Sequence, residues 1–184
     1  MLSTRYAELK PQSISAKVKT NEKAFLANIE KHKGVLYKVS RMYMDNTEDQ
    51  EDLFQEIVLQ LWKSYDQFRG DSQFSTWMYR VAINTAMVFL KKEKRKSMTT
   101  AYETEMDIAA EEYTHEKDTQ LEYFYKAVHE LNTVEKALIF LFLEGQSHKE
   151  IGKNLGLTEV NARVKLNRTK EKLQKIIQAN GYEF

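Results

Sequence analysis

The chain has 184 residues, 42% of them hydrophobic, which is enough for one ordinary domain or for two small ones. Its 28 basic and 27 acidic residues leave a formal net charge of +1, so the total charge alone does not indicate a polyanionic partner. Cysteine is absent, which excludes disulfides, zinc fingers and thiolate catalysis.

The sequence contains no segment typical of a membrane protein. A membrane-spanning helix needs about 18 uncharged apolar residues in a row, and the N-terminus lacks the apolar core of a secretory signal. We therefore expect a cytoplasmic protein without membrane insertion.

The sequence predicts an all-α fold made of two small helical domains joined by a flexible acidic linker. One proline and six glycines leave the helical periodicity nearly uninterrupted. Three apolar-periodic stretches precede the linker and four shorter ones follow it. The linker itself has many carboxylates and few large aliphatic residues. The expected ranges are 1–20 for an N-terminal extension, 21–97 for the first domain, 98–119 for the linker and 120–184 for the second domain.

Charge is distributed very unevenly along the chain. Acidic residues cluster between 48 and 56 and again between 103 and 122. Basic residues form a run at 91–96 and predominate between 149 and 175. The near-neutral net charge is therefore the sum of opposed patches.

The second predicted helix begins near Thr47, which forms a capping-box pattern with Gln50. Its core-facing side is predicted from apolar residues at spacings of three and four. These residues are Leu53, Phe54, Ile57, Val58, Leu61 and Trp62. Asp52, Gln55 and Glu56 fall on the other side, and from spacing alone such a side is more often a solvated surface than a binding surface.

An unusually aromatic loop follows, between residues 65 and 77. Gly70 and the turn-forming residues after it break the helical period. Phe74 and Trp77 lie close in sequence to Arg69, and aromatic rings beside arginines suit the binding of unstacked bases. The alternative, at least as common for any one ring, is that these side chains seal a small helical core.

The helix after this loop carries a polar and basic strip. At helical spacing Arg80, Asn84, Met87 and Lys91 share one face, and the helix ends in the basic run at 91–96. Such a strip suits the phosphate backbone of a nucleic acid. A lysine run alone is more often a solvated helix end that complements the helix dipole.

The C-terminal part contains a helix-turn-helix pattern. Ser147 and Glu150 form a capping box that starts a short helix ending at Gly156, and Thr158 then caps a second helix. Gly152 is small where the two helices would cross. The residues expected to point inward are Ile151, Leu155, Leu157, Ala162 and Leu166. Two helices of an ordinary bundle remain the alternative.

In a helix-turn-helix the second helix enters the major groove, so its early exposed residues are candidates for base contacts. These candidates are Thr158, Glu159, Asn161, Arg163 and Val164. Lys165, Arg168 and Lys170 are better placed for phosphates.

Two segments resemble the extracytoplasmic-function group of the sigma-70 family. Residues 51–80 resemble the second conserved region of that family, with an acidic helix, an aromatic loop after Phe-Arg-Gly and the run Phe-Ser-Thr-Trp-Met-Tyr-Arg from Phe74 to Arg80. Residues 131–173 resemble its fourth region. Two such segments in the correct order, separated by a linker, are far more specific than either alone.

The resemblance implies a sigma factor that binds core RNA polymerase and directs promoter recognition, promoter melting and transcription initiation. It places Asp52, Gln55 and Glu56 against the largest polymerase subunit. It also implies that the loop from Asp66 to Phe74 binds a base flipped out of the minus-ten element. The residues assigned to minus-ten DNA are Arg69, Phe74, Trp77, Arg80, Asn84, Met87, Lys91, Lys92 and Lys94. Those assigned to the minus-thirty-five element are Thr158, Glu159, Asn161, Arg163, Val164, Lys165 and Arg168.

The resemblance implies no catalytic site, cofactor or metal, and members of the group are often held inactive by an anti-sigma factor. One competing hypothesis is a helix-turn-helix regulator that binds promoter DNA without being a polymerase subunit. Another is a metal hydrolase using Glu112, His115 and Glu116, whose surroundings lack the apolar residues that a pocket needs.

Overall fold

The computed structural model describes the backbone of residues 11–70, 72–99 and 116–181, and the side-chain surroundings of residues 22–70, 72–93 and 119–181. In these ranges the chain forms seven α-helices and one short 3₁₀ helix and no strand, which confirms the predicted all-α class. In order they are α1 (Pro11–Tyr43), α2 (Thr47–Ser64), η1 (Tyr65–Gln67), α3 (Phe74–Thr99), α4 (Glu116–His129), α5 (Thr133–Leu143), α6 (His148–Leu155) and α7 (Glu159–Ala179).

Helices extend into segments that the sequence pattern left outside the two domains. α1 begins at Pro11, within the expected extension 1–20, and α3 and α4 reach Thr99 and Glu116 inside the expected linker. Proline is well tolerated in the first helical turn, and polar residues do not by themselves end a helix, so loss of apolar periodicity was a poor guide to these ends. The side chains of Glu112, His115 and Glu116 lie outside the described residues.

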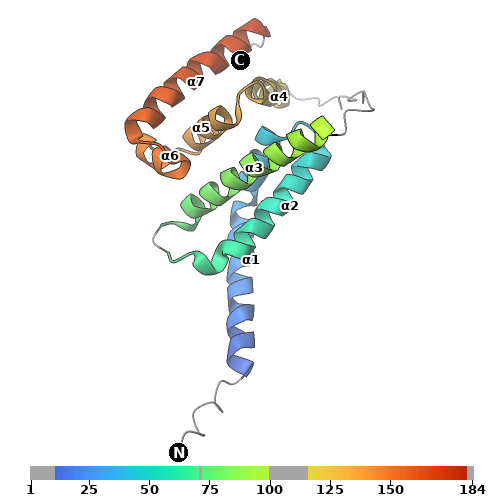
Figure 1. Ribbon diagram of the computed structural model, residues 1–184, viewed down its shortest axis with the longest axis vertical. Coiled ribbons are helices and arrows are strands. Elements are labelled where there is room, and N and C mark those ends of the chain that lie inside the picture. Colours follow the sequence, from blue (N-terminus) through green and yellow to red (C-terminus); the bar gives the residue numbers. More distant parts are fainter. Residues whose placement is uncertain (1–10, 71, 100–115, 182–184) are drawn as a thin grey trace, which may run out of the picture.

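The first three helices pack against one another as a bundle (Figure 1). α2 presents Leu53, Ile57 and Leu61 at a spacing of four, and all three are fully buried. They face a core to which α1 contributes Leu36 and α3 contributes Met78, each also fully buried. Burial of one such side chain stabilises the fold by about 1.5–3 kcal/mol. The N-terminal turns of α1 continue beyond this bundle (Figure 1).

α5 is the centre of the second group of helices. Six consecutive residues, 136–141, are buried, as expected for a helix enclosed by others, and all of them except Lys136 are apolar. α6 and α7 pack against it, and their residues Ile151, Ala162 and Leu166 are fully buried. At 11 residues α5 is short, and none of the helices in the described ranges is long and apolar enough to cross a bilayer.

The two groups of helices also contact each other, through α1 and α3 on one side and α4, α5 and α6 on the other. The Tyr43 hydroxyl donates a hydrogen bond of 2.9 Å to the carbonyl oxygen of Thr133. Burial raises the pKa of Tyr43 far above its ordinary value, so the hydroxyl remains a donor. The Arg41 guanidinium lies 4.3 Å from the centre of the Tyr125 ring, a cation–π contact across the same boundary.

Two details of α2 differ from the sequence prediction. The helix is capped by Asn46, whose side chain accepts a hydrogen bond from the backbone N–H of Asp49, and not by Thr47. Asparagine is as good a cap as serine or threonine, so the pattern did not distinguish the two neighbours. Trp62, expected in the core, is 40% exposed because it lies at the edge of the contact between α1 and α2.

Candidate functional site

The outer face of α2 carries the three residues predicted to bind polymerase. Asp52 and Gln55 are exposed and Glu56 is half-buried, and their spacing places them on adjoining turns of one surface. Gln60 Nε2 donates a hydrogen bond of 2.8 Å to Glu56 Oε1, which holds this carboxylate along the helix. The structure therefore brings the three side chains together.

An apolar groove of about 480 Å³ lies beside these residues, between α1 and α2, and Gln55 forms part of its wall. Its apolar lining consists of Phe25, Leu26, Phe54, Val58, Leu59 and Trp62. Leu26, Leu59 and Trp62 are 56%, 43% and 40% exposed. The sequence does not predict this groove, because the periodicity of one helix does not show which residues of another helix border it.

The aromatic loop forms a cluster of rings that pack on one another. The ring centres of Phe68, Phe74 and Trp77 lie 5.2, 5.4 and 5.7 Å apart in pairs, and Tyr65 links them to Phe25 of α1 at 5.2 Å. The rings thus seal the end of the bundle. Phe68, Phe74 and Trp77 are only half-buried, however, and each keeps part of its surface open for stacking.

The loop between η1 and α3 is exposed at Arg69 and turns at Gly70, whose φ of 76° favours glycine. Asp71, within the predicted base-holding loop from 66 to 74, lies outside the described residues. Arg69 directly follows Phe68 of the aromatic cluster in the chain, and its side chain is exposed.

The predicted polar strip on α3 is present. Arg80, Asn84 and Lys91 are exposed, as is Lys92, whereas Met87 is half-buried against the core. The side chain of Lys94 lies outside the described residues. A hollow of about 270 Å³ between α2 and α3 is lined by Glu56 and Asn84 together with Gln60, Thr85, Val88, Phe89 and Lys92. The predicted polymerase-binding and DNA-binding residues are therefore neighbours.

The two capped helices and the turn predicted for this segment are present. Ser147 and Glu150 make both hydrogen bonds of a capping box at the start of α6. The Ser147 hydroxyl and the Ser147 backbone N–H both donate to the Glu150 carboxylate, which lowers the pKa of Glu150. Gly156 ends the helix with a φ of 68°. Thr158 caps α7 by accepting a hydrogen bond of 3.2 Å from the backbone N–H of Asn161. At Gly152 a Cβ would lie 2.7 Å from the carbonyl oxygen of Leu157, so the close crossing requires glycine.

One face of α7 is buried and the other is open. Ala162, Leu166 and Thr169 are buried. All seven predicted minus-thirty-five residues are exposed: Thr158, Glu159, Asn161, Arg163, Val164, Lys165 and Arg168. Val160, which was not among the predicted residues, is 58% exposed and adjoins Glu159 and Asn161 in the chain. Lys170 differs from the prediction, because its ammonium lies 3.4 Å from the centre of the Phe142 ring and its charge is engaged there.

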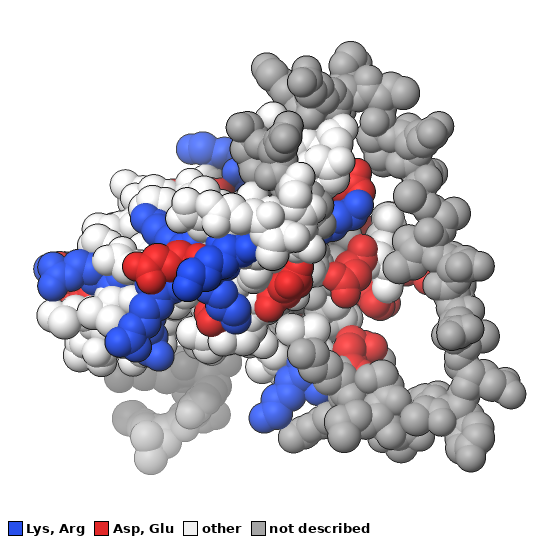
Figure 2. All heavy atoms as spheres, turned by 90° about the horizontal axis from the view of Figure 1, so that it is seen from above, with Lys and Arg blue, Asp and Glu red and all other residues white. Residues whose placement is uncertain are grey.

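Basic side chains gather on the face of the molecule that α7 forms. Lysines and arginines outnumber acidic residues along α7, and Figure 2 shows them grouped with a few carboxylates between them. Such a mixed but net positive surface suits a phosphate backbone.

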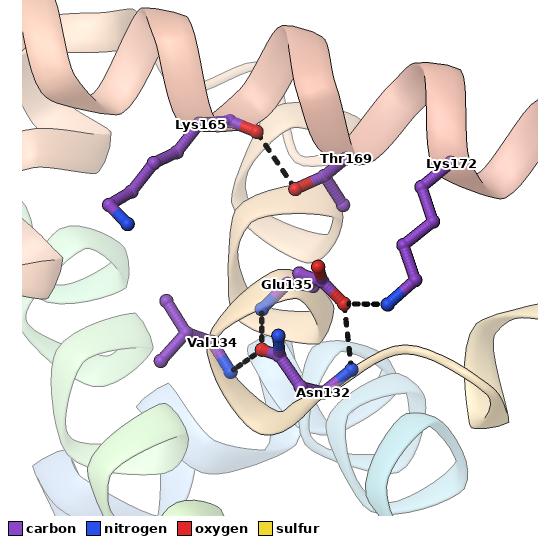
Figure 3. A network of polar contacts seen from close by, with 6 residues as sticks. All are labelled: Asn132, Val134, Glu135, Lys165, Thr169 and Lys172. Atoms are coloured by element: carbon purple, nitrogen blue, oxygen red, sulfur yellow. Dashed lines mark hydrogen bonds and ion pairs between the residues drawn. The ribbon is translucent and has the colours of Figure 1, made fainter.

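A polar network fixes α7 on the start of α5 (Figure 3). Asn132 and Glu135 form a capping box, and Lys172 Nζ of α7 lies 2.7 Å from Glu135 Oε2. Burial by itself would raise the pKa of Glu135, but hydrogen bonds from Lys172 and the Asn132 backbone and the Lys172 charge together lower it. In Figure 3 the Lys165 side chain points away from this network, which leaves its charge available at the surface.

Comparison with known proteins identifies both halves. Residues 29–96 match the Sigma-70 region 2 family and residues 121–173 match the Sigma-70, region 4 family. RNA polymerase sigma factor SigV of Bacillus subtilis is 30% identical over 154 residues, which cover 83% of this chain and 90% of SigV. The chain belongs to the sigma-70 family.

Other relatives of this chain are named as sigma factors of the extracytoplasmic-function (ECF) group. The ECF sigma-E factor of Haemophilus influenzae is 26% identical over 93% of this chain and 97% of its own length. ECF sigma factor SigG of Mycobacterium tuberculosis is 42% identical over 52 residues, which are 28% of this chain and 14% of SigG, so the chain spans a small part of that relative.

Two solved structures share the fold of this sigma-70 family member. The sigma factor RpoE of Bartonella quintana, in complex with the anti-sigma factor NepR, superposes with a TM-score of 0.68 at 19% identity over 85% of this chain and 98% of RpoE. CnrH in complex with the cytosolic domain of CnrY gives a TM-score of 0.63 at 19% identity, over 86% of this chain and 90% of CnrH.

Proposed function

We propose that this protein is a sigma factor that binds core RNA polymerase and directs promoter recognition, promoter melting and transcription initiation. The observation that carries the proposal is the presence of both sigma-70 regions, in order, on one chain. A helix-turn-helix alone would serve any DNA-binding regulator. The first region adds an acidic docking face and an aromatic loop, which a sigma factor needs and a simple regulator does not.

Core polymerase docks on α2 in this proposal. Asp52 and Gln55 are exposed, Glu56 adjoins them, and the apolar groove beside Gln55 offers surface whose burial stabilises a complex. A partner with basic residues around an apolar ridge would complement this surface.

The minus-ten element binds the loop and α3. Phe74 and Trp77 offer partly open rings for unstacked bases. The residues that contact this element are Arg69, Phe74, Trp77, Arg80, Asn84, Met87, Lys91, Lys92 and Lys94. The protein melts DNA by capturing released bases through binding, and the polymerase performs the nucleotidyl transfer.

The minus-thirty-five element binds α7. Its N-terminal residues reach base edges in the major groove, while Lys165 and Arg168 contact phosphates. The residues that contact this element are Thr158, Glu159, Asn161, Arg163, Val164, Lys165 and Arg168. Val160 adds apolar surface at the same face, suited to a thymine methyl group.

In this proposal the chain consists of domains 21–97 and 120–184 joined by an acidic linker at 98–119, after an N-terminal extension at 1–20. It has no catalytic residue and no cofactor, and it works in the cytoplasm, where it meets polymerase. An anti-sigma factor is a further partner, since RpoE and CnrH are each described in complex with another protein, which for RpoE is an anti-sigma factor.

Run-off transcription over a library of genomic promoter fragments tests the proposal. We expect products from a small set of fragments when both the protein and core polymerase are present, and none when either is omitted. The opposite result is a protein that yields no product and no polymerase complex but binds duplex DNA alone with ordinary operator affinity. That result would favour a helix-turn-helix regulator that is not a polymerase subunit.

A further inference from the structure

α1 carries a histidine on the face that packs against the rest of the first half. The core-facing positions of this helix, 25, 29, 32, 36 and 39, recur at spacings of four and three. Phe25, Leu36 and Val39 are buried there, and His32 is half-buried. An apolar side chain would fill this position at least as well, so packing alone does not account for an imidazole.

His32 borders the aromatic cluster of the loop before α3. Its ring centre lies 5.8 Å from that of Phe74, and the two ring planes are tilted by 35°. Phe74 therefore covers part of the imidazole ring. Within the part of the chain that the structure describes, neither ring nitrogen of His32 has a hydrogen-bond partner. The polar edge of the ring is thus left to meet a ligand at the border of the cluster.

The surroundings of His32 keep its ring neutral. Burial lowers the pKa of His32 below its ordinary value, and the charge of Lys31 lowers it further. The other charged or titratable groups on the elements beside it are Glu56 of α2, Tyr65 and Asp66 of η1, Arg69 of the loop and Tyr79 of α3. None of these shifts the pKa of His32. Among the described residues the imidazole therefore has no anionic partner, and its place is open to an anion of a bound molecule.

A phosphate of the minus-ten strand fits this place. Each phosphate of a nucleic acid lies one sugar away from a base, so a base stacked on the open surface of Phe74 brings phosphates to the border of the cluster. A protonated imidazole donates a charge-assisted hydrogen bond to a phosphate oxygen. The negative charge of the phosphate in turn raises the pKa of the imidazole.

We propose that His32 is a further residue of the minus-ten site, which binds a backbone phosphate beside the base stacked on Phe74 and takes up a proton as it does so. This proposal rests on the proposed sigma-factor function and deepens it. The pKa of His32 is low in the free protein and higher in the complex with DNA, so affinity rises as pH falls through the interval between the two values. Above that interval the ring is neutral in both states, and affinity is level.

The pH dependence of DNA binding tests the proposal. The complex of the full chain with core polymerase is titrated with a fluorescent forked minus-ten DNA, and anisotropy gives the affinity at about pH 5.5 and at about pH 7.5. We expect the wild type to gain at least about threefold more affinity at the lower pH than His32→Gln gains. His32→Phe keeps a ring against Phe74 and should lose the pH-dependent gain as well, whereas a residue that only packs would be replaced by phenylalanine without loss.

The matched control is His148→Gln, which removes a half-buried histidine from α6 in the other half. On a DNA without a minus-thirty-five element it should keep the pH dependence of the wild type. Methylphosphonate linkages, which remove the charge of one phosphate at a time, identify the partner of His32. One such linkage should abolish the pH-dependent gain of the wild type and leave the affinity of His32→Gln nearly unchanged.

The proposal is overturned if folded His32→Gln shows the same pH-dependent gain as the wild type. It is also overturned if no single methylphosphonate removes the gain, since His32 would then contact a base and not a phosphate. Failure of the sigma-factor function gives a different result, in which the wild type forms no complex with core polymerase and binds the forked DNA at neither pH. The role of His32 would then fall together with that function.

Discussion

At the scale of single residues, Gly152 sets how closely α6 approaches the turn before α7. A Cβ there would lie 2.7 Å from the carbonyl oxygen of Leu157 and 3.4 Å from the backbone nitrogen of Glu159. Backbone atoms of a packed turn do not move away easily, so Gly152→Ala should lower the free energy of unfolding by about 1–3 kcal/mol. Urea denaturation measures this loss.

The matched control is Gly34→Ala in the middle of α1, where nothing lies within 4 Å of an added Cβ. Alanine favours the helix there, and the free energy of unfolding should rise by up to about 1 kcal/mol. Equal changes in the free energy of unfolding for the two substitutions would show that the Leu157 carbonyl oxygen does not exclude a side chain at position 152.

Glu135 makes the stability of the second half depend on pH. Its pKa is lower in the folded protein than in the unfolded chain. The stabilisation is therefore complete above the ordinary glutamate pKa and is lost as pH falls through the folded value. Glu135→Gln retains a capping-box residue but not the charge, so it should flatten the acid limb of a plot of unfolding free energy against pH.

The pair is partly exposed, so we expect its contribution to stay below about 1 kcal/mol. In a double-mutant cycle Lys172→Gln should add little to Glu135→Gln. Identical acid limbs for wild type and Glu135→Gln would exclude the network of Figure 3 as the origin of this pH dependence.

Single residues were predictable where a local rule decides them. The caps Ser147 and Thr158 and the left-handed Gly156 were predicted and are present. The hydrogen bonds that Glu144 accepts from Lys38 and Tyr79 were not predicted, because these partners lie 106 and 65 residues away in sequence. No local pattern brings such residues together.

At the scale of helices, α3 is predicted to grip the DNA backbone through the exposed lysines at its C-terminal part. Lys91→Ala with Lys92→Ala should reduce the slope of log affinity against log salt by about two units for a minus-ten fragment, because each lost phosphate contact removes about one released counterion. Fluorescence anisotropy over a salt series measures the slope.

Lys23→Ala with Lys31→Ala, two exposed positions on α1, is the control with the same change in net charge, and its slope should match the wild type. If both pairs shift the slope equally, net charge and not the α3 surface governs binding.

The loop before α3, together with Asn84 of α3, is predicted to act in strand opening. Arg69→Ala and Asn84→Ala change exposed side chains and leave the core intact. Each should reduce run-off transcription from a duplex promoter and have little effect on a template with a pre-melted bubble, because base capture is then no longer needed to open the strands. Lys63→Ala, exposed at the end of α2, should match the wild type on both templates. Failure of the bubble to rescue the variants would count against base capture.

The helices were largely predictable because their apolar residues recur with helical spacing, as Leu53, Ile57 and Leu61 do. Their ends were less predictable, since neither Thr99 nor Glu116 carries a strong start or stop signal. The groove that contains Trp62 was not predictable, because it exists only where α1 and α2 meet.

At the scale of the whole molecule, the acidic residues of α2 and the basic residues of α7 lie on different surfaces. The acidic residues of α2 lie on the first half, and the basic residues of α7 lie on the second. The uneven charge along the sequence predicted this separation. It did not predict that the halves pack together through buried groups such as Tyr43, which reaches Thr133 ninety residues away.

The central claim is that α2 attaches this molecule to core RNA polymerase. Its most direct test is the affinity of core polymerase for the wild type and for the triple variant Asp52→Ala, Gln55→Ala, Glu56→Ala. The matched control removes two carboxylates and one amide from the other half, as Glu122→Ala, Glu171→Ala and Gln174→Ala. We predict tight binding by the wild type and the control, and a loss of at least about a hundredfold in the α2 variant. A wild-type protein that does not bind core polymerase, or a folded α2 variant that binds as the wild type does, would contradict the account.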